Sequence, residues 1–90
     1  MTEREVVVGH RLGLHARAAA KLVQLSSQFQ CNVVLCRADG ASGVKSTEAD
    51  ARSILSILLL SAGFGSRLYV RAHGTDEEEA LNRICEYLAG

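Results

Sequence analysis

The alternation of apolar and polar residues along the chain predicts four strands. Residues 5–8 form a short β-branched run that ends at a glycine, and residues 31–37 are rich in β-forming residues before the turn dipeptide at residues 39–40, Asp-Gly. Residues 44–50 alternate weakly, whereas residues 67–73 alternate polar and apolar throughout. The last pattern is typical of a strand that is half buried and faces solvent on its other side.

Three other stretches carry apolar residues at helical spacing, which predicts three helices. They cover residues 16–28, residues 54–60 after a serine at position 53, and the chain that follows Thr75. Thr75 and Glu78 have the spacing of a capping box, and acidic residues crowd the first turn that follows. The residues of the third helix that we expect in the core are Ala80, Leu81, Ile84 and Leu88.

The predicted order is βαββαβα, which indicates an α+β fold in which an antiparallel sheet carries its helices on one face. The chain of 90 residues is short enough that we expect a single domain over residues 1–90 with one core.

Composition narrows the range of functions. Ten basic and ten acidic residues give a formal net charge of zero with no Lys/Arg block, which argues against a nucleic-acid or anionic-membrane binder. Three cysteines without CxxC spacing, and no secretory signal, favour the reducing cytoplasm. The longest apolar run, residues 54–60, is interrupted by Ser56 and is too short to cross a bilayer, so we expect a soluble protein.

The stretch GLHARAAA, residues 13–20, places one histidine directly before an alanine-rich helical turn. At the N-cap, His15 would lie beside backbone N–H groups that lack intrahelical partners, at the positive end of the helix dipole. Because the dipole disfavours an imidazolium cation, we expect a largely neutral ring at pH 7. Neutral imidazole is the nucleophilic form of histidine.

A phosphoryl group on this ring would find hydrogen-bond donors close by. Its oxygens could accept from the backbone amides of Ala16 and Arg17, and the Arg17 guanidinium would be a second, charge-assisted donor. Exposed contacts of this kind contribute about 1 kcal/mol each, which orients the group without trapping it. The simpler alternative is that His15 is an ordinary cap or surface residue.

Residues 12–17, LGLHAR, resemble the active-site motif of the HPr family, the histidine-containing phosphocarriers of the phosphoenolpyruvate-dependent phosphotransferase system. The resemblance runs from the first strand to the third helix. It implies an open-faced β-sandwich of four antiparallel strands covered by three helices. It also implies that His15 is phosphorylated at Nδ1, that Arg17 is the active-site arginine, and that phosphate comes from enzyme I and leaves to a IIA-type domain.

The chain departs from the family pattern at Ala18, where the family has proline. Alanine is an excellent helix former, so we expect a slightly looser first turn and retained chemistry. The family's regulatory serine, the target of a serine kinase and phosphorylase, has two candidates, Ser46 by position number and Ser53 by its place before the apolar run. The match of Ser53 and the two apolar residues after it favours Ser53, with a plain N-cap as the simpler alternative.

The second helix is apolar on nearly every side, so part of it should stay exposed for interactions. By the resemblance, this surface and the first turn of the first helix dock the partner proteins. We assign Ile54, Leu55 and Leu58 to docking and expect Ile57 and Leu60 in the core. Residues 47–53 and 76–81 further resemble the nitrogen-related branch of the family, which serves regulatory phosphorelays.

The sequence thus predicts a phosphoryl carrier on His15, a substrate of its partners rather than a stand-alone turnover enzyme. One alternative is a regulatory module that docks on targets, with phosphorylation as a switch. Another is a degenerate homologue that Ala18 has made inactive. We expect no cofactor and no metal, because His10 and His73 have no ligand spacing with His15.

Overall fold

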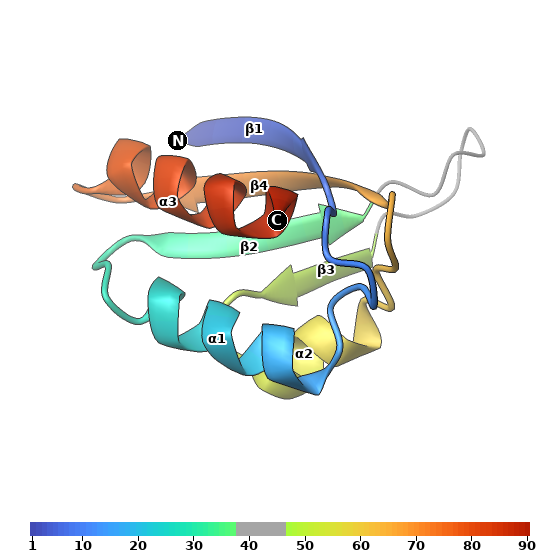
Figure 1. Ribbon diagram of the computed structural model, residues 1–90. Coiled ribbons are helices and arrows are strands. Elements are labelled where there is room, and N and C mark those ends of the chain that lie inside the picture. The colour runs from blue at the N-terminus through green and yellow to red at the C-terminus, as the bar shows by residue number, and fades with distance from the viewer. Residues whose placement is uncertain (38–46) are drawn as a thin grey trace.

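The computed structural model describes residues 1–37 and 47–90, and its elements follow the predicted order (Figure 1). The strands are β1 (Thr2–Val7), β2 (Asn32–Arg37), β3 (Thr47–Asp50) and β4 (Arg67–His73). The helices are α1 (Ala16–Ser26), α2 (Ile54–Leu59) and α3 (Glu77–Ala89).

The four strands form one antiparallel sheet in the order β1-β4-β2-β3, so β4 and β2 are central. Figure 1 shows all three helices on the same face of this sheet, with α3 over β1 and β4 and with α2 near β3. α1 lies between the other two helices. The predicted α+β open-faced sandwich is therefore confirmed.

The core lies between the sheet and the helices, and strand periodicity explains its composition. Leu68, Val70 and Ala72 alternate along β4 and are all fully buried, while the residues between them face the open side. Register pairs Leu35 of β2 with Val70 of β4, which aligns the apolar faces of the two central strands. The four residues predicted as the core of α3 are all fully buried, namely Ala80, Leu81, Ile84 and Leu88.

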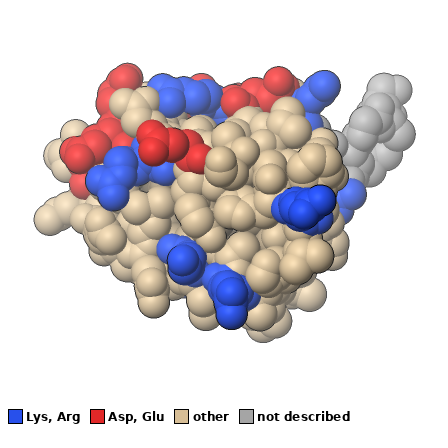
Figure 2. All heavy atoms as spheres, viewed as in Figure 1, with Lys and Arg blue, Asp and Glu red and all other residues tan. Residues whose placement is uncertain are grey.

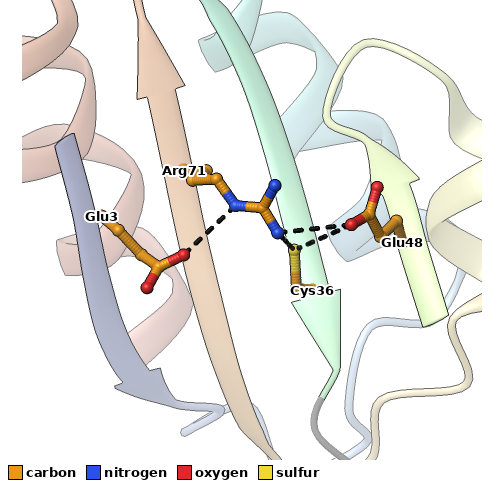
Figure 3. Close-up of polar contacts among 4 residues, drawn as sticks. All are labelled: Glu3, Cys36, Glu48 and Arg71. Carbon is orange, nitrogen blue, oxygen red and sulfur yellow. Dashed lines mark hydrogen bonds and ion pairs between the residues drawn. The ribbon is translucent and has the colours of Figure 1, made fainter. Parts of the chain in front are cut away.

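The open face of the sheet carries charged side chains that pair across the strands (Figure 3). Arg71 of β4 bonds Glu3 of β1 through Nε (3.1 Å) and Glu48 of β3 through Nη2 (3.3 Å). The same Nη2 lies 2.8 Å from the Sγ of Cys36 on β2. Burial raises the pKa of the Cys36 thiol, which favours its protonated form. The cluster links residues of all four strands on one face.

Element boundaries differ from the sequence prediction at several ends. β1 begins at Thr2 rather than at residue 5, and α1 ends at Ser26 rather than at residue 28. The predicted third strand is present over Thr47–Asp50, whereas residues 44–46 and the turn at residues 39–40 lie outside the described residues.

The predicted capping box of α3 is wrong. The N-cap residue is Asp76, and its side chain makes no cap bond. Its carboxylate instead accepts the backbone amides of Gln30 (2.8 Å) and Cys31 (2.9 Å), and the bond from Gln30 holds its pKa below the usual range. The Asp76 carboxylate is therefore engaged in tertiary hydrogen bonds rather than in a cap of α3. Close by, the carboxylate of Glu77 accepts the backbone amide of Gly74 at 3.1 Å.

Candidate functional site

His15 stands at the end of the segment that connects β1 to α1, and contacts with the chain after α2 fix this segment. Gly13 has a φ of 71°, and a Cβ there would lie 2.6 Å from the carbonyl oxygen of Ala62. Only glycine fits this close approach. The next amide, of Leu14, donates to the same carbonyl at 2.9 Å, and the Leu14 side chain is buried. With Leu14 anchored inward, His15 is exposed at the surface.

His15 is the N-cap residue of α1, as the sequence predicts, and it caps the helix through both its backbone and its ring. The residue is extended (φ −79°, ψ −178°), and its carbonyl accepts the first helical amide, that of Ala19, at 2.8 Å. Its Nδ1 accepts the backbone N–H of Arg17 at 3.3 Å. An Nδ1 that accepts a hydrogen bond carries a lone pair, which is the form required of a nucleophile.

One detail differs from the prediction made for the amides at this helix start. The amide of Arg17 is bonded to the imidazole itself rather than unpartnered. The Arg17 side chain is exposed, and none of the ion pairs found in residues 1–37 and 47–90 involves it. Ala18 is buried at the third helical position. The first turn thus presents one ring and one guanidinium to solvent.

A shallow hollow of about 560 Å³ lies beside the ring, lined by His10, Arg11, Leu12 and His15. Leu12 is among the most exposed large apolar residues of the described chain. Neither Leu12 nor Arg11 was a candidate site residue from sequence, although Leu12 is the first residue of the motif and Arg11 directly precedes it. The hollow lies against His15, the predicted phosphoacceptor.

The outer side of α2 is apolar and exposed. Ile54 (43% exposed), Leu55 (67%) and Leu58 (37%) lie at the surface, whereas Ile57 and Leu60 are buried, as expected. The sequence analysis missed three more exposed apolar residues. Together, the exposed apolar residues near the motif and α2 form what we call the apolar patch: Leu12, Ile54, Leu55, Leu58, Leu59 and Phe64.

Ser53 is the N-cap of α2, and its Oγ accepts the backbone amide of Ser56 at 3.2 Å. At the other end of this helix, Arg37 of β2 donates to the carbonyl oxygens of Leu60 (3.1 Å) and Ser61 (2.9 Å). These contacts fix the two ends of a short helix that has no charged residue of its own. Ser46, the competing candidate for the regulatory serine, lies outside the described residues.

Charge is segregated even though the net charge of the chain is zero. No Asp or Glu occurs from Val6 to Arg37 or from Ala51 to Thr75, the segments that include α1 and α2. Figure 2 shows blue spheres without red ones over the lower part of the molecule, where α1 and α2 lie in Figure 1. The surface around His15 is therefore apolar and cationic, and Arg11, Arg17 and Lys21 are its exposed cations.

Over residues 1–37 and 47–90, no cluster of His, Cys, Asp and Glu could hold a metal ion. No helix in the same part of the chain is long and apolar enough to span a bilayer. All three cysteines are free thiols, and burial raises the pKa of Cys31 to about 11.

Fold and site together define a class: a small open-faced sandwich domain that presents an exposed histidine at a helix start, inside an apolar and cationic surface. The family model described as the PTS HPr component phosphorylation site matches residues 2–90. The chain belongs to the HPr family of phosphotransferase-system phosphocarriers.

Relatives carry the names of both family branches. The chain is 43% identical to the phosphocarrier protein HPr of Xylella fastidiosa, over 96% of this chain and 89% of the relative. It is 40% identical to the phosphocarrier protein NPr of Proteus mirabilis, over 90% of this chain and 83% of the relative. The crystal structure of the HPr of Bacillus anthracis superimposes with a TM-score of 0.84 at 32% identity, covering 97% and 95% of the two chains.

These similarities support a phosphocarrier role in the phosphotransferase system. They do not favour the alternative of a module that works by docking alone. Membership of the family implies enzyme I and a IIA-type domain as partners.

Proposed function

We propose that His15 is the phosphoacceptor and that the first turn of α1 stabilises its phosphorylated form. The observation that carries this proposal is the Nδ1 of an exposed ring that accepts the backbone amide of Arg17. In the phosphoryl transfer, the Nδ1 lone pair forms the new N–P bond. The bond to the enzyme I histidine breaks, and its electron pair stays on that imidazole.

The hydrogen bond of the resting state prepares the site for its product. Once Nδ1 carries phosphorus, it can no longer accept the Arg17 amide, so this N–H becomes available to a phosphoryl oxygen. The amide of Ala16 and the guanidinium of Arg17 are the other two donors that we assign to the phosphoryl group. Each contact is exposed and contributes about 1 kcal/mol, so onward transfer to a IIA-type domain stays feasible.

We propose that the apolar patch, which includes Ile54, Leu55 and Leu58, docks both partners. Exposed apolar clusters mark interaction surfaces, and α2 packs against α1, the helix that carries the exposed cations Arg17 and Lys21. A partner surface with a hydrophobic centre and carboxylates at its rim would match it. The two partners would then use overlapping contacts, so the carrier would dissociate from one before it binds the other.

For Ser53 we propose an N-cap role in the carrier. A serine kinase that modified its Oγ would first have to break the bond from the Ser56 amide. Mass spectrometry of the protein recovered from cells decides whether a phosphorylated form occurs. We place the carrier in the cytoplasm, where phosphoenolpyruvate is available and buried thiols such as those of Cys31 and Cys36 stay reduced.

Incubation with labelled phosphoenolpyruvate and purified enzyme I tests the central proposal. We expect an acid-labile phosphate on the wild-type chain and none on His15→Ala. His73→Ala, which removes an exposed histidine of β4, is the matched control and should be labelled normally. Labelling that persists in His15→Ala would refute the assignment of the phosphoacceptor.

A further inference from the structure

The last turn of α3 bonds both flanks of the segment that carries His15. The amide of Gly9 donates to the carbonyl of Leu88 at 2.9 Å. A Cβ at Gly9 would lie 1.8 Å from the carbonyl oxygen of Ala89, so the two backbones meet without room for a side chain. Downstream of His15, the hydroxyl of Tyr87 donates to the carbonyl of Ala18 at 3.3 Å. One turn of α3 therefore contacts the chain before and after the site.

Tyr87 contacts the chain both before and after His15. Its backbone carbonyl lies 2.7 Å from the Nε2 of His10, and the two rings pack with centroids 4.8 Å apart. His10 in turn accepts the Gly13 amide on its backbone carbonyl at 2.8 Å, two residues before His15. On the side before His15, contacts thus connect Tyr87 through His10 to the turn that precedes His15.

On the side after His15, the connection from Tyr87 to His15 is shorter and passes through a single peptide unit. The carbonyl of Ala18 and the amide of Ala19 belong to the same planar group, which is rigid. Tyr87 holds the oxygen of this group, and the N–H of Ala19 donates to the carbonyl of His15 at 2.8 Å. A hydrogen bond to a carbonyl polarises the peptide and strengthens the bond that its N–H donates. Two hydrogen bonds and one rigid plane therefore connect Tyr87 to His15.

We propose that Tyr87 is a positioning residue for phosphoryl transfer, acting through the peptide of Ala18 and Ala19 on the orientation of His15. The inference rests on the proposed role of His15. Burial raises the pKa of the Tyr87 phenol, so the hydroxyl stays protonated and available as a donor. The ring is half-buried, and the hydroxyl touches no reacting atom. Its contribution is to hold the first turn of α1 in the geometry that the phosphoryl group requires.

The variant Tyr87→Phe removes the hydroxyl and keeps the ring that packs on His10. The chain has two tyrosines, so Tyr69→Phe on the open face of the sheet is a matched control. We expect Tyr87→Phe to lower the turnover rate of phosphorylation by phospho-enzyme I about fivefold, the factor that roughly 1 kcal/mol of one hydrogen bond supports. The KM for phospho-enzyme I should stay unchanged because the apolar patch is intact, and Tyr69→Phe should match wild type in both constants.

A second readout separates positioning from a general loss of stability. Amide hydrogen exchange at Ala19 should become faster in Tyr87→Phe, whereas exchange in the central strands β2 and β4 should not change. A wild-type turnover rate in Tyr87→Phe, an equal loss in Tyr69→Phe, or faster exchange throughout the core would each overturn the inference. If the wild-type chain is not phosphorylated at all, the proposed function fails instead, so the two failures are distinguishable.

Discussion

Arg17 and Arg71 have the same side chain and opposite surroundings. Arg71 bonds Glu3, Glu48 and the Cys36 thiol on the open face of the sheet (Figure 3). The Arg17 side chain is exposed at the start of α1, in a segment without carboxylates, and takes part in none of the ion pairs of the described chain. A guanidinium whose donors are already taken by its own chain links neighbouring strands. One without such partners suits the role that we propose for Arg17, a donor to a phosphoryl group that arrives and leaves.

The largest expected effect comes from truncating the arginine at the start of α1. Arg17→Ala removes the guanidinium that we propose as a charge-assisted donor to the phosphoryl group, and for an exposed contact the lower end of the range for such bonds applies, about 1.5 kcal/mol, so transfer from phospho-enzyme I should slow by about tenfold. Arg71→Ala should leave the transfer rate unchanged and lower the unfolding free energy only slightly, because its pairs are solvent-exposed. Rapid-quench kinetics and chemical denaturation of both variants measure the contrast. Equal effects on transfer would remove the distinction between the two arginines.

The next effect compares apolar residues on the two faces. Leu55 is two-thirds exposed, so Leu55→Ala should scarcely alter stability, yet the loss of a docking contact of about 1 kcal/mol or more should raise the KM for phospho-enzyme I about five- to tenfold. Val34→Ala, on the open face, should leave this KM unchanged. Steady-state kinetics at fixed ionic strength tests the pair. An unchanged KM in Leu55→Ala would exclude this residue from the docking surface.

A third, smaller effect concerns acid. The Thr2 hydroxyl, with the Gly74 amide, lowers the pKa of Glu77 from 4.5 to about 2. A depressed folded-state pKa means that the ionised form stabilises the fold above pH 4.5 and that this contribution is lost as pH falls towards 2. The melting temperature of wild type should therefore fall more steeply over that window than that of Glu77→Gln. Glu78→Gln, one residue further along α3, should behave as wild type.

Sequence patterns predicted the fold well because strands and helices here have clean periodicities. Alternation along residues 67–73 specified the buried face of a strand, and helical spacing after Thr75 specified the buried face of a helix. The layered fold follows because such apolar faces pack against each other. The N-caps at His15 and Ser53 were also predictable, since a cap bond forms within three residues of the cap.

The remaining features depend on contacts between distant residues. The N-cap residue of α3 is Asp76 rather than the predicted Thr75, and it makes no side-chain cap bond because amides 45 and 46 positions earlier in the chain donate to its carboxylate. The contact from Tyr87 to Ala18 joins residues 69 positions apart and has no local signature. Charge segregation was visible in the sequence, but a net charge of zero concealed it, because opposite charges cancel in the sum and not in space.

The smallest expected effect uses the position at which this chain departs from the family pattern. Ala18 is the third residue of α1, where a backbone N–H has no intrahelical partner, so proline would cost no hydrogen bond. Ala18→Pro should raise the unfolding free energy by about 0.4–1 kcal/mol by restricting the unfolded chain.

Lys21→Ala, one turn further along the same helix, is the matched control for this variant. It changes an exposed residue and should shift the unfolding free energy by no more than about 0.5 kcal/mol. Because Ala18 is buried, the added ring must also find room beneath the first turn. A loss of stability in Ala18→Pro, measured by denaturation, would show that the packing around this buried position leaves no room for a proline ring.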